Sequence, residues 1–270
     1  MAENLYLPQI GKISKIEQPT KDIKIINIRL SSPLFIKPGQ FVLVGLPGYG
    51  EATFGLVSPT FRRKEITILF RKVGFLTNKL FEVERGDKVT VRSRPIGKPL
   101  PWPEMIGSDL VLVAGGTGIA PIAGLADEIA ASRKKFGQVY FLYGVACPED
   151  LLLQEKLKYW EKKKIKIKLA CEKPDKDWQG ERGFVTSYIP NLEINPKKIF
   201  VLMVGPQPMY EPIAKEFKKI GLTQSQIYIS LERRLRCGLG KCQHCTCNSH
   251  YLCLDGPFFT FDIAKKMGAI

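Results

Sequence analysis

The sequence predicts an antiparallel β-barrel, then an α/β domain with a parallel sheet, then a short metal-binding module. Three observations lead to this fold class. Short strands separated by turn residues continue up to about Pro101, strands alternate with helices after Asp109, and five of the seven cysteines lie between Cys237 and Cys253. A chain of 270 residues is long enough for two domains and a small third one. We place the three parts at residues 1–103, 104–227 and 228–270.

The amino-terminal part has the pattern of a small antiparallel barrel. Turn residues recur at Pro38-Gly39, Pro47-Gly48 and Gly86-Asp87, and no strong helical pattern separates them. Regular short strands of this kind are typical of a barrel. The expected strands are Ile10–Ile16, Ile23–Leu30, Gln40–Val44, Glu65–Phe70 and Lys88–Val91.

The middle part alternates strands with helices, which predicts βαβ units and a parallel sheet. A buried strand, Leu110–Ala114, leads into a glycine turn and a helix that reaches Ser132. The tail from Tyr228 is too short for a core of its own, so we expect it to depend on its metal. The remaining expected elements are the strands Val139–Tyr143, Ile165–Ala170 and Phe200–Val204, and the helices Glu149–Lys162 and Met209–Lys219, the second ended by Gly221.

The composition is that of an ordinary globular protein, with 44% apolar and 25% charged residues. The start, Met1–Tyr6, has neither the basic nor the apolar region of a secretory signal, so none is expected. The longest apolar run, Leu110–Ala126, is broken by glycines and Pro121, so we expect no membrane span. Together these features predict a cytoplasmic protein.

The formal net charge of +15 raises the question of nucleic-acid binding. The lysines are spread along the chain, and the densest patch, Lys162–Leu169, alternates basic with apolar residues. That alternation predicts a strand with Ile165, Ile167 and Leu169 inward and its lysines in water. We therefore expect a solvated surface suited to high temperature and no nucleic acid. A docking face for an acidic electron carrier or subunit is the intermediate interpretation.

The cysteine-rich tail predicts an iron–sulfur site. Cytosolic thiols stay reduced, so a dense group of them indicates a metal before disulfides. The spacing Cys237-x4-Cys242-x2-Cys245, with Cys253 further on, fits the plant-type 2Fe–2S pattern. Gly238 and Gly240 let the backbone come close to such a cluster and point amides toward sulfur.

Other metal centres remain as alternatives for this tail. Four thiolates can also hold a structural zinc, although paired CxxC knuckles are missing. A Rieske centre is suggested by His244 and His250, but the two Cys/His pairs are too close in sequence for separate loops. Cys247 is the surplus member of the group, whereas Cys147 and Cys171 are most simply core residues.

Three further segments are candidates for binding phosphate groups. The turn Gly115-Gly116-Thr117-Gly118 lies between a buried strand and a helix, where free amides attract an anion, although tight strand–helix packing alone explains its glycines equally well. Gly205-Pro206 follows another strand at the edge where ligands bind in open α/β sheets. In the barrel part, Arg71–Thr77 runs from a strand into a helix start that Thr77 can cap.

The order of these segments resembles the ferredoxin-reductase superfamily. The relevant motifs are Val73-Gly74-Phe75-Leu76-Thr77, Arg94-Pro95-x-Gly97, Gly115–Pro121 and Gly205-Pro206-x-x-Met209. The ending Ser230-Leu-Glu-Arg-Arg-Leu-Arg-Cys237, with Cys253-x-Asp255-Gly256-Pro257, narrows the resemblance. It is similar to the branch with the gamma subunits of cytoplasmic NiFe (sulf)hydrogenases, the corresponding subunit of anaerobic sulfite reductase and the electron-transfer subunit of dihydroorotate dehydrogenase.

This resemblance implies an electron relay between NAD(P)(H), an FAD on the barrel, a 2Fe–2S cluster in the tail, and other subunits of a multi-subunit redox complex, most simply a hydrogenase. It nominates no general acid or base. The implied FAD-binding residues are Phe54, Ser58, Arg71, Val73, Gly74, Leu76 and Thr77; the implied NAD(P)-binding residues are Gly115, Gly116, Thr117, Gly118, Gly144, Gly205 and Pro206; and the implied cluster ligands are Cys237, Cys242, Cys245 and Cys253.

Two departures from the family pattern fall around the centre of hydride transfer. Gly55 stands where family members have a hydroxyl beside the flavin, although Ser58 is nearby. Val204 stands where many members have a cysteine next to the nicotinamide. They motivate an alternative function, a non-catalytic FAD and 2Fe–2S subunit for electron transfer or assembly that no longer binds nicotinamide. A zinc-dependent nucleic-acid-binding protein is the second alternative, and NAD is not distinguished from NADP.

Overall fold

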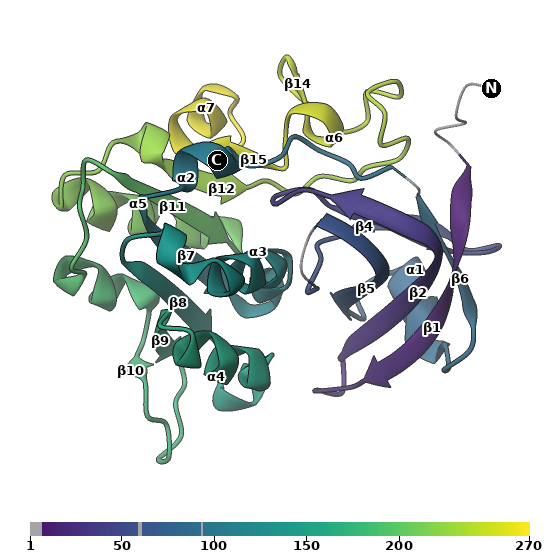
Figure 1. Cartoon of the computed structure of the whole chain (residues 1–270), viewed down its shortest axis with the longest axis horizontal. Helices are drawn as coiled ribbons and strands as arrows, with labels where there is room; N and C mark the ends of the chain where they lie inside the picture. Colours follow the sequence, from purple (N-terminus) through teal and green to yellow (C-terminus); the bar gives the residue numbers. More distant parts are fainter. Residues whose placement is uncertain (1–6, 59–60, 93) are drawn as a thin grey trace.

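The computed structural model describes residues 7–58, 61–92 and 94–270. The first six residues, on which the expectation of no secretory signal rests, lie outside this described part. Figure 1 shows the barrel beside the α/β domain, with the tail running over both. Within the described residues, no helix is both long enough and apolar enough to cross a membrane.

The barrel is a six-stranded antiparallel sheet in the order β4-β3-β6-β1-β2-β5. A bridge between Leu56 and Ile68 brings the two ends of this order together, so the sheet is nearly closed. The predicted strands are confirmed, but β2 is longer than expected because it bends at an irregularity between Arg29 and Leu34. The strands are β1 (Pro8–Glu17), β2 (Ile23–Ile36), β3 (Val42–Leu46), β4 (Gly50–Phe54), β5 (Phe61–Arg71) and β6 (Lys88–Arg92), and one helix, α1 (Phe75–Glu82), precedes β6.

The α/β domain is built on a seven-stranded sheet in the order β10-β9-β8-β7-β11-β12-β15. All neighbouring strands are parallel except β15, which pairs antiparallel with β12. The strands are β7 (Asp109–Gly115), β8 (Val139–Val145), β9 (Lys166–Cys171), β10 (Glu181–Arg182), β11 (Ile199–Val204), β12 (Ile227–Ser230) and β15 (Phe258–Thr260), and the helices are α2 (Trp102–Met105), α3 (Ile119–Ala131), α4 (Gln154–Lys162) and α5 (Tyr210–Lys219). The prediction of βαβ units is therefore confirmed, and the sheet is mixed at one edge only.

Helix α3 is buried because it lies between the sheet and the barrel. Ten of its thirteen residues are buried, which a one-sided amphipathic helix would not require. Its side chains pack in one core with Ile23, Val57 and Leu69 of the barrel and with Leu112 of β7. The two domains therefore share a core across their interface.

The tail continues the sheet of the α/β domain. Its strands β12 and β15 extend that sheet, and Cys245, Cys247 and Cys253 pack in the same core as β11 and α5. The tail thus has no separate core, but it shares the core of its neighbour; its dependence on a metal stays a prediction. Its other elements are β13 (Thr246–Cys247), β14 (His250–Tyr251), α6 (Leu252–Asp255) and α7 (Phe261–Lys266).

Candidate functional site

The barrel presents an open helix start at the end of β5. Helix α1 begins after Gly74, and Thr77 caps it from inside its first turn. Thr77 Oγ1 accepts hydrogen bonds from the N–H groups of Val73, at 3.1 Å, and Gly74, at 2.9 Å. The N–H groups that follow have no partner inside the helix, so this end can hold an anionic group. Leu76 packs against the barrel core and Val73 is exposed.

Arg71 is anchored within the barrel and lies close enough to the α/β domain for its charge to act on Tyr143. Its Nε lies 3.4 Å from Asp22 Oδ2, and the N–H of Lys72 donates to the Asp22 carbonyl at 2.8 Å. Burial raises the pKa of the Tyr143 phenol above its ordinary value, and the nearby charge of Arg71 acts against that rise. Arg71 therefore stands where the barrel faces the carboxyl end of β8.

The predicted nucleotide-binding glycines meet at one edge of the parallel sheet. Gly115 and Gly144 are paired at the carboxyl ends of β7 and β8, and β11 ends one position before Gly205. Strand β5 contacts the short 3₁₀ turn Gly116–Gly118 that follows β7. The candidate FAD-binding segment of the barrel and the candidate nucleotide-binding turn of the α/β domain are therefore adjacent. The resemblance to the ferredoxin-reductase superfamily implies the same arrangement.

The glycine turn after β7 has one closely packed side and one open side. A Cβ on Gly118 would lie 2.3 Å from the Val204 carbonyl oxygen, so a side chain is excluded there. Gly116 has a φ of +53°, and a Cβ on it would meet nothing within 4 Å. Tight packing thus explains Gly118, whereas the left-handed backbone and open space at Gly116 leave room for a ligand.

Two tyrosines that the sequence did not single out hold this edge together. Tyr143 donates its hydroxyl hydrogen to the Gly116 carbonyl at 3.1 Å, and Tyr210 accepts from the N–H of Gly205 at 3.3 Å while donating to the Ser230 carbonyl at 2.7 Å. Both are buried. The available signal was their position, since Tyr143 directly precedes Gly144 at a strand end.

The segment after β4 forms the contact between the barrel and α3. A Cβ on Gly55 would lie 2.4 Å from Pro121 Cβ, so this glycine permits the close approach of α3. Ser58 is buried, and its Oγ accepts a hydrogen bond from the N–H of Thr67 at 3.0 Å. Phe54 has its ring in the barrel core against Phe70, with centroids 5.9 Å apart. The side chains of Phe54 and Ser58 are thus both engaged inside the barrel.

Four of the five tail cysteines form two thiol pairs. The thiols of Cys237 and Cys242 influence each other's ionisation, and the Cys245 thiol acts in the same way on Cys253. In the described part of the chain, no three His, Cys, Asp or Glu side chains are arranged around a single metal ion. Within the described residues, the four thiols therefore interact as two pairs.

Backbone amides point at these sulfurs. Leu239 and Cys242 donate their N–H groups to Cys237 Sγ, each at 3.4 Å, and Gly240 donates to Cys253 Sγ at 3.2 Å. Burial alone would raise the pKa of Cys237, but these amides, together with the Cys242 thiol, lower it to about 7. For Cys253, burial and then the Cys245 thiol raise the pKa to about 12. The loop thus favours a thiolate at one end even without a metal charge.

The loop that carries the thiols needs its glycines. Gly238 and Gly240 have φ angles of +69° and +72°. A Cβ on Gly238 would lie 2.6 Å from Ile96 Cδ1 of the barrel, and the N–H of Gly97 donates to the Cys253 carbonyl at 3.1 Å. The cysteine loop is therefore seated directly on the barrel.

Cys247 turns away from the four thiols. Its Sγ lies 3.7 Å from the Met267 carbonyl oxygen and 3.5 Å from an Arg233 Nη atom, and it is buried. Cys171 is buried at the end of β9, and Cys147 contacts Asp150 through its thiol at 3.1 Å. None of these three cysteines joins the two pairs.

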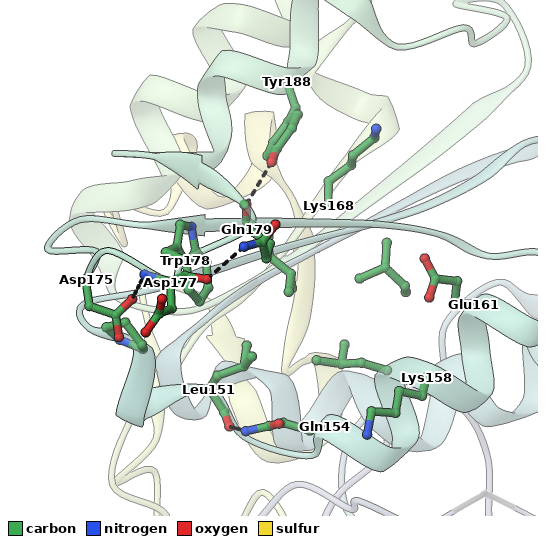
Figure 2. Close-up of a pocket in the computed structure, with 15 residues that line it drawn as sticks. Leu151, Gln154, Lys158, Glu161, Lys168, Asp175, Asp177, Trp178, Gln179 and Tyr188 are labelled. Carbon is green, nitrogen blue, oxygen red and sulfur yellow. Dashed lines mark hydrogen bonds between the residues drawn. The ribbon is translucent and has the colours of Figure 1, made fainter.

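A cavity of about 610 Å³ lies elsewhere, at the outer edge of the sheet (Figure 2). It opens between α4, β9 and the loop 175–180, with Trp178 and Tyr188 among its walls. The predicted site residues do not line it. The open space that follows Gly116 is therefore separate from this cavity.

Comparisons with known proteins identify two segments of the chain. The family described as "Oxidoreductase NAD-binding domain" matches residues 112–215, and the "Iron-sulfur cluster binding domain of dihydroorotate dehydrogenase B" matches residues 232–263. The gamma subunit of sulfhydrogenase 2 from Pyrococcus furiosus is 34% identical over 99% of this chain and 100% of its own length. A probable dihydroorotate dehydrogenase B electron transfer subunit from Thermococcus kodakarensis is 29% identical over 93% of this chain and 95% of its own.

Solved structures share the fold. An NADH-dependent reduced ferredoxin-NADP oxidoreductase matches with a TM-score of 0.73 at 20% identity, over 99% of this chain and 94% of that one. A ferredoxin NADP+ reductase from Neisseria gonorrhoeae, solved with bound FAD and NADP, matches with a TM-score of 0.71 at 19% identity, over 82% and 96% of the two chains. At these identities the likeness establishes the architecture.

Proposed function

Because this chain belongs to the family of electron-transfer subunits that includes the sulfhydrogenase gamma and dihydroorotate dehydrogenase B subunits, we propose that it carries electrons between NAD(P)(H) and a partner catalytic subunit, most simply a NiFe hydrogenase. One observation carries the proposal. The strand β5, which leads into the helix start of α1, contacts the glycine turn after β7, and the cysteine loop is bound to the same barrel through the hydrogen bond from the Gly97 N–H to the Cys253 carbonyl.

The barrel residues fit an FAD. The first-turn amides of α1 would hold its pyrophosphate, with Thr77 fixing the turn and Arg71 adding positive charge. When bound, FAD supplies the exchange of an electron pair on one side and of single electrons on the other. A nicotinamide nucleotide would be held at Gly116, Gly144 and Gly205, on the side of the α/β domain that β5 of the barrel contacts.

The tail residues fit a 2Fe–2S cluster better than zinc. Such a cluster takes two thiolates on each iron, which matches the pairs Cys237 with Cys242 and Cys245 with Cys253. A structural zinc takes four ligands around one point. The three amide hydrogen bonds to sulfur would tune the reduction potential of the cluster and orient the loop.

The two departures from the family pattern have packing reasons. Gly55 is in close contact with Pro121 of α3, and the Val204 side chain is buried in the core that also contains Leu112 of β7. Packing therefore explains the residue type at both positions, so neither departure implies that nicotinamide binding has been lost. We propose NAD(P)(H) as the two-electron partner on this ground.

Anaerobic mixing of the reconstituted protein with NADH or NADPH tests the proposal. We expect the flavin absorbance to bleach with at least one nucleotide and the cluster to be reduced afterwards. In Cys237→Ser, flavin bleaching should persist while electron flow to the partner stops. If neither nucleotide bleaches the flavin, the non-catalytic electron-transfer or assembly function takes the place of this proposal.

A further inference from the structure

The cysteine loop reaches the surface at one thiol. Cys245 and Cys253 are each 2% exposed and Cys237 is half-buried, whereas Cys242 is exposed, as are its neighbours Gln243 and His244. Whatever the four thiols hold can therefore be approached most closely from the side of Cys242. Electron transfer between proteins needs such close approach, so this face is where a partner has to dock.

The surface around Cys242 is basic. Arg234, Arg236 and Lys241 are exposed on the loop itself. The barrel segment Arg94–Lys98 adds two more exposed cations, and it is joined to the tail because the N–H of Lys98 donates to the Gly256 carbonyl. Over residues 232–244 the only acidic side chain is Glu232.

Two arginines of this surface differ from three lysines elsewhere in the described residues. Each of those lysines pairs with a glutamate three residues away, in Lys79–Glu82, Lys158–Glu155 and Lys219–Glu216. Across the described ranges, Arg234 and Arg236 form no ion pair with a carboxylate. Their charge is available to a partner, and it can steer one over a distance of about 10 Å at moderate salt.

An exposed apolar side chain stands among these charges. Leu254 is 45% exposed, and a Cβ on Gly240 would lie 2.4 Å from its Cδ1 atom. Leu254 thus rests on the cysteine loop itself. Protein–protein contacts typically combine such an apolar anchor with a polar rim.

We propose that this cluster face, formed by Arg94, Lys98, Arg234, Arg236, Lys241 and Leu254, docks the carboxylate-rich surface of an electron-transfer protein. The proposal rests on the proposed function, because electrons leave the chain at this face. Leu254 enters an apolar depression of the partner. The Asp and Glu side chains of the partner pair with the basic residues around Leu254. A nucleic acid would satisfy the charges but offers no apolar socket for Leu254, so a protein fits the face better.

The test is a binding titration with the oxidised, cofactor-loaded protein. The probe is a strongly acidic plant-type ferredoxin, titrated calorimetrically at low salt and again at about 0.5 M salt, where the Debye length is a few ångströms. We expect binding at low salt that weakens at least tenfold at high salt. The double variant Arg234→Glu/Arg236→Glu should weaken low-salt binding about 10- to 100-fold, as expected when electrostatic steering is reversed.

A matched control carries the same charge change at a distant place. Lys134→Glu/Lys135→Glu lies in the 3₁₀ turn Arg133–Lys135, at the amino-terminal edge of the sheet, where both lysines are exposed. It should change binding less than about twofold. Leu254→Asp should also weaken binding, while the visible absorbance of flavin and cluster shows that each variant remains assembled.

The outcomes separate this proposal from the one it rests on. The docking face is overturned if ferredoxin does not bind, or if the two double variants weaken binding equally. It is also overturned if the protein prefers duplex DNA and that binding depends on Arg234. Reduction of ferricyanide by NAD(P)H reports flavin turnover without docking. If that reduction fails while ferredoxin binding follows the predicted pattern, the nicotinamide relay is wrong and the docking face stands.

Discussion

Replacing Gly55 by serine separates two explanations for the departure at this position. On the family pattern, serine would restore a hydroxyl beside the flavin. In the structure, however, a Cβ here would lie 2.4 Å from Pro121 Cβ and 2.7 Å from Pro121 Cα. Carbon atoms in contact are normally about 3.5 Å apart or more, so the first turn of α3 would have to withdraw by roughly 1 Å.

The expected cost follows from that displacement. Overpacking of this kind destabilises a protein by about 1–3 kcal/mol. Replacing glycine also lowers the conformational entropy of the unfolded chain, which stabilises the folded state by about 0.4–1 kcal/mol. The melting temperature of the apoprotein should therefore fall by roughly 2–8 °C. Because α3 begins at the nucleotide-binding turn, flavin reduction by NAD(P)H should also slow, by up to about 100-fold for an error of 1 Å.

Thermal unfolding followed by circular dichroism, and stopped-flow reduction of the flavin, measure these two effects. Gly144→Ser is the control for stability, since a Cβ at Gly144 would lie 3.4 Å from Val185 Cγ1, an ordinary contact. A Gly55→Ser protein with an unchanged melting temperature and faster flavin reduction would refute the packing explanation.

Three further predictions follow from buried groups. Lys24→Met should lower the free energy of unfolding by about 1–3 kcal/mol in urea, because Lys24 Nζ donates to the carbonyls of Phe81 and Val83 at the end of α1; a loss below about 0.5 kcal/mol would contradict this. Burial raises the pKa of Tyr210 to about 12, above its ordinary value of about 10, so its contribution to stability should be complete below pH about 10 and disappear as the pH rises toward 12. Tyr210→Phe should remove that part of the alkaline transition, and an identical pH profile would argue against it. Cys247→Ser should keep the full iron content by chemical assay, whereas Cys245→Ser should lose it; equal loss in both would show that Cys247 is a ligand.

Most of the α/β domain could be predicted from the sequence because its strands are continuous apolar runs. Strand β7 is buried from Leu110 to Ala114, and α5 ends before Gly221, which has a φ of +94°. In β9 the exposed Lys166 and Lys168 alternate with less exposed apolar residues, as their spacing indicates. Patterns of this kind depend on neighbours in sequence, so they are visible without a structure.

Elements held by distant contacts were not predictable. Strand β4 has the sequence Gly-Glu-Ala-Thr-Phe, which has weak strand propensity, and it forms because it pairs with β3. Helix α4 was expected from Glu149 but begins at Gln154, because Pro148–Asp150 forms a 3₁₀ turn and Leu153 adopts a left-handed φ of 55°.

The candidate site shows the same limit. Spacing singled out four thiols, and the structure gives them their pairing and directs Cys247 toward Met267. The contact between Gly55 and Pro121 and the roles of Tyr143 and Tyr210 depend on how the barrel meets the sheet. These relations join residues far apart in the chain, and only the folded arrangement reveals them.

Iron and sulfide analysis combined with electron paramagnetic resonance tests the central claim most directly. After anaerobic reconstitution, we predict about two irons and two sulfides per chain, the stoichiometry of one 2Fe–2S cluster held by four cysteines. Addition of NADH or NADPH should then produce the signal of the reduced cluster through the flavin. Tightly bound zinc in place of iron, or a flavin that is reduced while the cluster stays oxidised, would contradict the relay.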